Sequence, residues 1–252
     1  MRNFLKEILE KKKEELPHLY RQYEHHVPIH RNHGFSQALK NTHLSLIAEL
    51  KKASPSKGII NPQFNVIELA NQYIHHGAKA LSVLTEPHFF LGDPLFIPLV
   101  KKHFDIPILR KDFIIDAIQI KESVFLGADA ILLIQACLSV NQTQQLINEA
   151  SQYHLDVLLE VHDQNELDMA LSYTGLSIIG INNRNLNSFK IDISTASALK
   201  KAIPNSYMTV AESGYQHFEQ LQQLTLEKFD AVLIGTGLVE NKELISFFTK
   251  AS

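Results

Sequence analysis

The chain has 252 residues, of which 45% are hydrophobic, and its 24 Lys and Arg against 27 Asp and Glu give a formal net charge of -3. This length and apolar content are sufficient for one domain of the size of an α/β barrel. The near balance of charge, without a long basic stripe, argues against nucleic acid as a partner. We therefore expect a single domain over residues 1–252.

The charge pattern also argues against export and membrane insertion. The run from Lys11 to Glu15 would interrupt the apolar core of a secretory signal. No stretch approaches the roughly 18 consecutive apolar residues of a membrane span. The single cysteine, Cys137, cannot form an internal disulfide, and it follows an apolar run at 131–134, which indicates a buried structural thiol. We expect a cytoplasmic protein with no membrane partner.

The first two dozen residues predict an amphipathic helix, because apolar side chains recur at helical spacing among charged ones. These apolar residues are Phe4, Leu5, Ile8, Leu9 and Leu16. We expect this helix to end before Pro28 and to belong to an N-terminal helical extension over residues 1–40. The repeating part of the chain then occupies residues 41–252.

Eight short apolar runs predict strands, at 44–50, 80–84, 106–109, 130–134, 156–159, 177–181, 207–211 and 231–234. Several are apolar throughout, which is typical of a parallel sheet covered on both faces. Helical patterns such as 66–74 and 143–150 lie between them, and Gly77, Gly127 and Gly175 lie where such helices end. The simplest architecture is an α/β fold of the (β/α)₈ TIM-barrel type. An open doubly wound sheet remains the alternative, since periodicity does not prove closure.

Polar side chains follow several of these runs directly. In a barrel the carboxyl ends of the strands carry the chemistry. Ionisable groups there lose solvent and need a partner or a ligand. The residues at these ends are Glu49, Lys51, Lys111, Glu160, Asn182, Arg184, Glu212 and Ser213. This mixture of acids and bases suits proton transfer, although a ring of structural ion pairs would look the same.

Glycines after the last two strands indicate an anion site. At Gly214, Gly235 and Gly237, backbone N–H groups can approach a phosphate closely, and a helix beginning near Leu238 would add its positive end. The alternative is that residues 235–237 form an ordinary tight turn, because short glycine motifs are weak signals.

The histidines do not predict a metal site. Glu160 and His162 could supply two ligands, but no third is evident, so we expect no metal. The pairs at 25–26 and 75–76 are interpreted as solvated.

Six ordered segments at strand ends, covering nearly the whole chain, resemble the indole-3-glycerol-phosphate synthase family. They are residues 47–56, 81–86, 107–114, 127–134, 180–186 and 211–214. The N-terminal extension also resembles the extra segment of that family. The family converts 1-(2-carboxyphenylamino)-1-deoxyribulose 5-phosphate to indole-3-glycerol phosphate with loss of carbon dioxide and water, as a carboxy-lyase of tryptophan biosynthesis. It uses no cofactor.

The resemblance implies a role for each matching residue. Lys111 is expected to protonate the ribulose carbonyl oxygen while the aromatic ring carbon attacks. Lys51 is expected near the substrate carboxylate with a share in the acid steps. Glu160 is expected to serve as acid or base in the dehydration, and Glu49 to hold the lysines and the substrate in register.

The remaining assignments concern binding. Asn182, Glu212 and Ser213 match pocket positions that we group with the catalytic residues, and Arg184 is expected to order the network around them. Phe113 and Leu132 are expected to form apolar walls. The residues expected to contact the phosphate are Ser54, Gly214, Gly235 and Thr236. The chain departs from the family at Gly237 and Val239, where a polar residue and a methionine are usual. It also contains no Trp, so an aromatic contact that some relatives take from an N-terminal tryptophan has to come from elsewhere.

The competing interpretations are another phosphate-binding barrel enzyme such as phosphoribosylanthranilate isomerase, a non-catalytic barrel that binds a phosphorylated metabolite, and a subunit that requires a partner. The first fits poorly, because its start is shorter and its strand-end residues differ. We expect a small phosphorylated substrate and a monomer or weak homo-oligomer.

Overall fold

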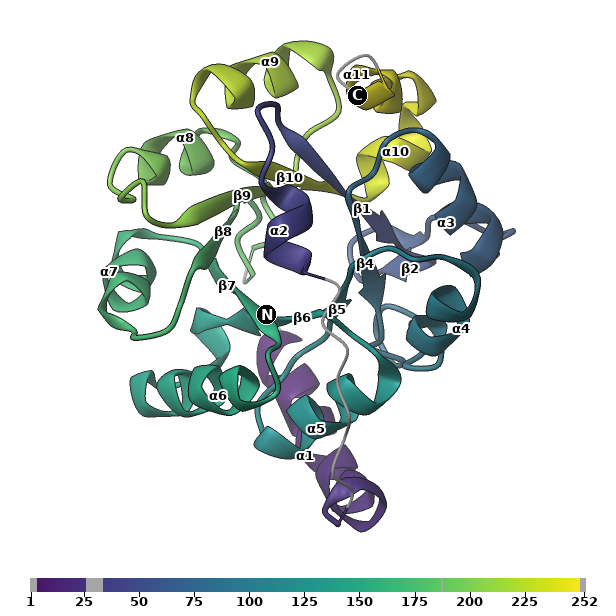
Figure 1. Ribbon diagram of the computed structural model, residues 1–252, viewed down its shortest axis with the longest axis vertical. Helices are drawn as coiled ribbons and strands as arrows, with labels where there is room; N and C mark the ends of the chain where they lie inside the picture. Colours follow the sequence, from purple (N-terminus) through teal and green to yellow (C-terminus); the bar gives the residue numbers. More distant parts are fainter. Residues whose placement is uncertain (1–3, 26–33, 187, 250–252) are drawn as a thin grey trace.

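The computed structural model describes residues 4–25, 34–186 and 188–249. Eight parallel strands close into a barrel in the order β1-β10-β9-β8-β7-β6-β5-β4 (Figure 1). They are β1 (Ser45–Leu50), β4 (Ala80–Leu84), β5 (Ile108–Lys111), β6 (Ala130–Ile134), β7 (Asp156–Val161), β8 (Ile178–Asn182), β9 (Met208–Glu212) and β10 (Ala231–Ile234). The predicted (β/α)₈ architecture is confirmed, and the open-sheet alternative is wrong.

The helices that follow the strands lie outside the ring (Figure 1). They are α3 (Val66–His75), α4 (Phe96–His103), α5 (Ala117–Leu126), α6 (Val140–Gln152), α7 (Gln164–Ser172), α8 (Ser194–Lys200), α9 (Phe218–Leu226), α10 (Thr236–Glu240) and α11 (Ser246–Thr249), with 3₁₀ turns η1 (Gln135–Cys137) and η2 (Lys242–Ile245). Side-chain caps begin several of them: Asn65 caps α3, Asp116 caps α5 and Ser139 caps α6. Gly127 ends α5 in the left-handed conformation, as its position predicts.

Four strands continue further than the apolar pattern indicates. Predicted to stop at residues 109, 159, 181 and 211, they instead include Lys111, Glu160, Asn182 and Glu212. The backbone ladder continues through these residues, with Asn182 opposite Glu212. Polarity suggested a strand end, but ion pairs between the inward side chains allow them to stay buried, so the ladder need not stop. The third strand also begins at Ile108, two residues later than expected.

Alternation along each strand divides the core into two layers. The inner layer includes Ile47, Leu109, Leu158 and Leu233, and the short helix α2 (Phe35–Leu39) contributes Phe35 and Leu39 to it. In Figure 1, α2 lies across the centre of the ring. The outer layer packs strands against helices. Two residues beyond the inner apolar residues come Glu49, Lys111, Glu160 and Gly235, which therefore face the barrel mouth.

The N-terminal helix α1 (Phe4–Tyr23) is present as predicted, whereas Pro28 lies outside the described residues. Helix α1 packs against α5. Its Lys12 is only 2% exposed and places Nζ 2.9 Å from the Asp112 carboxylate, directly after β5. Asp112 also accepts hydrogen bonds from Thr85 and Arg110. Burial alone would raise the pKa of Asp112, but Lys12 and then Arg110 outweigh it and hold that pKa well below its usual range.

Two further features were not predicted or differ from prediction. After β1 the chain forms a small antiparallel hairpin of β2 (Ala53–Ser54) and β3 (Gly58–Ile59). Cys137 is half-buried in η1 and not fully buried as expected. Of the helices in the described part of the chain, none has the length and apolarity that a membrane crossing needs.

The buried Lys12 predicts an unusual sensitivity at the N-terminus. Lys12→Met is expected to lower the free energy of unfolding by about 3 kcal/mol, because removing one partner of a buried ion pair leaves the other charge uncompensated, although Arg110 still faces Asp112. Denaturant titration measures this change. Lys11→Met is the matched control, since Lys11 is 47% exposed and its ion pair with Glu14 at 2.8 Å lies on the surface, and it is expected to leave the denaturant midpoint nearly unchanged. Equal effects of the two substitutions would contradict this prediction.

Candidate active site

One pocket at the carboxyl ends of the strands contains every residue that the sequence placed in the site. Its lining includes Glu49, Lys51, Ser54, Lys111, Phe113, Leu132, Glu160, Asn182, Arg184, Glu212, Ser213, Gly214, Gly235 and Thr236. These residues come from the ends of strands that are far apart in the sequence, and closure of the barrel brings them together.

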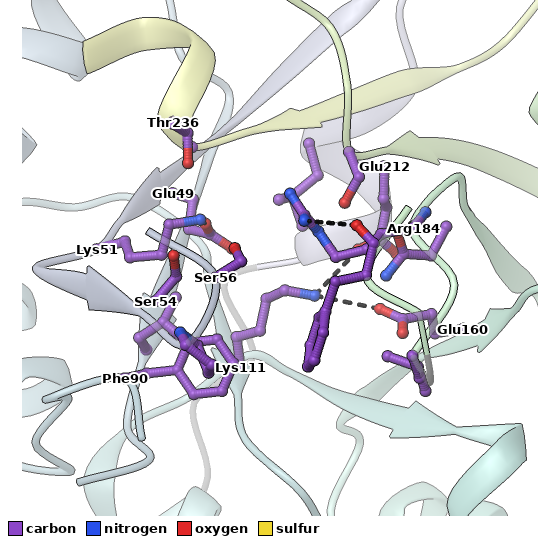
Figure 2. A pocket seen from close by; sticks show the side chains of 18 of the residues that line it. Glu49, Lys51, Ser54, Ser56, Phe90, Lys111, Glu160, Arg184, Glu212 and Thr236 are labelled. Carbon is purple, nitrogen blue, oxygen red and sulfur yellow. Dashed lines mark hydrogen bonds and ion pairs between the residues drawn. The ribbon is translucent and has the colours of Figure 1, made fainter. Parts of the chain in front are cut away.

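The Lys111 ammonium group lies between two carboxylates (Figure 2). Its Nζ is 3.0 Å from Glu212 Oε2 and 3.3 Å from Glu160 Oε2. The lysine side chain is 16% exposed, whereas each glutamate side chain is 2% exposed. Burial would lower the pKa of Lys111, but Glu212 and Glu160 outweigh burial and raise it, so the lysine carries its proton at neutral pH.

The two carboxylates differ in protonation although both contact Lys111. Burial acts to raise the pKa of Glu160, but Lys111 and then His162 hold it well below its usual range. Burial raises the pKa of Glu212 to about 7 against the opposing effect of Lys111, and the charge of Glu160 adds to this rise. Near neutral pH, Glu160 is therefore ionised while Glu212 exchanges a proton.

A second ion pair, Lys51 with Glu49, lies at the end of β1. Gly235 leaves the space for it, because a Cβ at this position would overlap the Glu49 carboxylate and approach the Lys51 amine. Gly180 leaves space for the Glu212 carboxylate in the same way. The sequence indicated Gly235 only as a close approach for an anion, whereas the structure shows that it also accommodates this ion pair.

Small polar groups gather around the Lys51 side of the pocket. Figure 2 shows Ser54, Ser56 and Thr236 there. Thr236 is the first residue of α10, which therefore begins two residues before the predicted Leu238. Gly214 has a φ of 93°, in the region that favours glycine. Gly237 packs tightly, because a Cβ there would overlap the carbonyl of Tyr215.

The segment after β8 forms a hydrogen-bonded wall. The Arg184 backbone N–H donates to Asn182 Oδ1 at 2.9 Å, and its guanidinium donates to the Phe189 carbonyl at 3.2 Å. Asn183, which the sequence did not single out, donates from its side-chain amide to the Ser213 carbonyl and to the Tyr215 hydroxyl, each at 3.0 Å. This amide ties the loops after β8 and β9 together.

The apolar walls include the expected Phe113 and Leu132, together with residues that the sequence analysis did not assign to the site. These are Phe4, Leu5 and Ile8 of α1, with Phe90 and Phe189 from loops. The Phe4 ring meets Phe89 and Phe189 edge-on, with centroids 5.2 Å apart in each pair. Phe4 thus supplies an aromatic group from the N-terminus in a chain without Trp. The apolar face of α1 was visible in the sequence, but its partner was not.

The described residues include no group of three or more His, Cys, Asp or Glu that could hold a metal ion. His162 instead contacts Glu160 and Glu166.

Comparison with known proteins decides the family. The family model for indole-3-glycerol phosphate synthase matches residues 3–250. The chain belongs to the indole-3-glycerol phosphate synthase family. The indole-3-glycerol phosphate synthase of Chlorobium limicola is 43% identical over 249 residues, which cover 96% of each chain. That of Chlorobium chlorochromatii is 44% identical over 243 residues, covering 95% of this chain and 93% of the relative.

Among solved structures, the α subunit of tryptophan synthase from Legionella pneumophila is similar with a TM-score of 0.61 and 14% identity, covering 88% of this chain and 98% of that one. At this identity the likeness shows the barrel fold alone.

The position of Gly235 beside Lys51 and Glu49 yields a prediction about the synthase site. Gly235→Ala is expected to lower kcat/KM at least about tenfold while the thermal midpoint stays nearly unchanged, because the added Cβ displaces the flexible ends of two side chains and not the backbone. Steady-state kinetics and thermal unfolding measure the two effects. Competition by inorganic phosphate is measured alongside. If phosphate competition weakened while kcat stayed at the parental value, Gly235 would act through the anion and not through the ion pair.

Proposed function

We propose that this chain catalyses the reaction of its family, closing the indole ring of 1-(2-carboxyphenylamino)-1-deoxyribulose 5-phosphate with loss of carbon dioxide and water. The observation that carries the proposal is the Lys111 ammonium group held between two buried carboxylates in a pocket with apolar walls. A purely structural ring of ion pairs would not require the Lys111 side chain to remain partly exposed to the pocket.

In the first step Lys111 donates a proton to the ribulose carbonyl oxygen as the aromatic ring carbon attacks the carbonyl carbon. A cation in a pocket of low dielectric stabilises the charge that develops on that oxygen more strongly than water would. The raised pKa of Lys111 keeps the proton in place until that charge appears. Glu212, with a pKa of about 7, can then return a proton to the lysine.

The attacking ring carbon is the one that carries the carboxylate, so the new carbon–carbon bond makes this carbon tetrahedral and interrupts the aromatic ring. Loss of carbon dioxide from the same carbon restores aromaticity. Lys51, with Glu49 at its side, is proposed to meet that carboxylate before it leaves. Ionised Glu160 then accepts a proton from the carbon next to the ring nitrogen, and the Lys51 ammonium group protonates the neighbouring hydroxyl group, which leaves as water while the indole double bond forms. The balance requires no oxidant, so no redox cofactor is proposed.

The phosphate is proposed to bind near Ser54, Gly214, Gly235 and Thr236, where hydroxyl and backbone N–H groups converge. Phe113 and Leu132, joined by Phe4 and Phe90, are proposed to enclose the anthranilate ring. These contacts hold both ends of the substrate, so that binding energy positions the reacting carbons.

Location and assembly are also proposals. We propose a cytoplasmic monomer or weak homo-oligomer that needs no partner subunit for turnover. Size-exclusion chromatography of the purified chain tests the oligomeric state. Activity measured across the same peak tests whether the chain turns over substrate without a partner subunit. Incubation with the ribulose-phosphate substrate, followed through the indole chromophore, distinguishes an enzyme from a barrel that only binds the metabolite.

Lys111→Ala is expected to fold normally and to lose about 10²–10⁴-fold in kcat, since general acid catalysis typically contributes that much. The indole chromophore and the thermal midpoint are measured together. Lys200→Ala is the matched control: this lysine is also partly buried, but it donates to Thr209 at 2.7 Å on the outside of the barrel. We expect the control to stay within about threefold of the parent. A Lys111 variant equally close to the parent would remove the lysine from its role.

Glu160→Gln is expected to impair the dehydration more than substrate binding, because the amide retains the shape but cannot accept a proton. Rapid quenching and product analysis are expected to reveal an intermediate that has lost carbon dioxide but not water. Glu227→Gln serves as the control, since Glu227 accepts a hydrogen bond from Ser197 at 2.9 Å and does not line the pocket. A change confined to KM in the Glu160 variant would make Glu160 a binding residue.

A further inference from the structure

His162 lies behind Glu160 and does not line the pocket. It follows β7 directly, two residues after Glu160, and its side chain is 9% exposed. Its Nε2 is 3.2 Å from Glu160 Oε1, and its Nδ1 is 2.9 Å from Glu166 Oε2. The same Glu166 oxygen accepts the His162 backbone N–H at 2.8 Å. Glu166 therefore holds the imidazole from α7, and Nε2 lies within ion-pair distance of Glu160 without making a hydrogen bond among the described residues.

We propose that His162, oriented by Glu166, is a positioning residue that keeps Glu160 the ionised member of the two carboxylates around Lys111 and leaves the exchangeable proton on Glu212. The inference rests on the proposed role of Glu160 in the dehydration. It assigns the difference between the two carboxylates to a group outside the pocket.

The contacts of the two carboxylates differ in this way. Glu160 meets Lys111 through Oε2 and His162 through Oε1, so both of its oxygens face cations. Glu212 meets Lys111 through Oε2, while its buried Oε1 has no hydrogen-bond partner among the described residues. A carboxylate that faces two cations remains ionised more readily than an equally buried one that faces one.

The surroundings of His162 favour its charged form. Glu160 on its own strand and Glu166 on α7 both carry negative charge toward it, and the Cys137 thiol on η1 lies near the same two carboxylates. Lys111 from β5 and Glu212 from β9 lie on the far side of Glu160. Burial acts to lower the pKa of His162, but Glu160 and Glu166 outweigh it and raise that pKa to about 10. Burial raises the pKa of Cys137, so the thiol adds no charge at neutral pH.

A purely structural role is the competing explanation, because Glu166 also accepts the backbone N–H of His162 and so fixes the start of α7. Such a role predicts a loss of stability without a change in the pH dependence of catalysis. A charge role predicts a change in that dependence. A charge role also makes the effect on folding stability depend on pH. Because the pKa of His162 is raised on folding, the stabilisation that His162 contributes is complete below about pH 6.5 and is lost as pH rises through about 10.

The test compares His162→Gln, Glu166→Gln and His76→Gln with the parent. His76 is the control, since its ring contacts the backbone carbonyl of Gln72 at 2.7 Å directly after α3 and does not line the pocket. For His162→Gln we expect KM within about threefold of the parent, the acid limb of the kcat profile moved upward by about one pH unit, and kcat lowered by up to about tenfold on that limb. Glu166→Gln is expected to move the limb in the same direction by less, and His76→Gln not to move it. The stability difference between parent and His162→Gln is expected to shrink between about pH 7 and 10.

NMR of the imidazole groups in the parent supplies a reading that is independent of activity and of how the variants fold. We expect the His162 ring to remain doubly protonated at pH 8. A neutral ring at that pH, or a parental pH profile in folded His162→Gln, would overturn the inference. If Glu160→Gln itself turned over at the parental rate, the proposed function of Glu160 would fail instead. If Glu160→Gln lost activity while His162→Gln kept the parental kcat profile, this inference would be overturned and the proposed function of Glu160 would stand.

Discussion

The ion pairs of Lys111 with Glu160 and Glu212 are the interaction on which the barrel mouth depends. Two nearly inaccessible carboxylates lie within 3.3 Å of the same ammonium group. Without that cation, two buried negative charges would face each other, and burial would drive both toward the neutral form. With it, one carboxylate remains ionised and the other titrates near neutrality. The same contacts that stabilise the buried charges therefore place a proton donor and two proton acceptors around one space.

The N-terminal helix supports this arrangement from two directions. Lys12 binds Asp112, the residue between Lys111 and Phe113, from outside the barrel. Phe4 and Ile8, on the same helix, line the pocket. Lys12 and Arg110 therefore fix the Asp112 carboxylate at the residue between Lys111 and Phe113, which both line the pocket. The extension thus stabilises the end of β5 and completes the apolar wall.

Two inward glycines provide the space that the charged groups occupy. Gly180 faces the Glu212 carboxylate, and Gly235 faces Glu49 and Lys51. In a closed barrel each inward position competes with its neighbours for the same volume, so a long ionic side chain on one strand requires a small residue on the next. This gives Gly235 a packing role in addition to any contact between its backbone and an anion.

The sequence by itself determined the eight strands, the helical extension and the set of charged residues at the strand ends. It did so because the apolar period reports burial and because ionisable groups directly after buried strands are costly without partners. It placed Lys111, Glu160 and Glu212 in one site but could not say which carboxylate holds a proton, since that depends on the cations that meet each oxygen. His162 looked like half of an incomplete metal site, and Lys12 like one member of the charged run from Lys11 to Glu15. Only the tertiary structure decided that Glu166 of α7 holds His162 beside Glu160, that Lys12 is buried against Asp112, and that Gly235 faces an ion pair. Each of these depends on contacts between separate elements, which local patterns do not record.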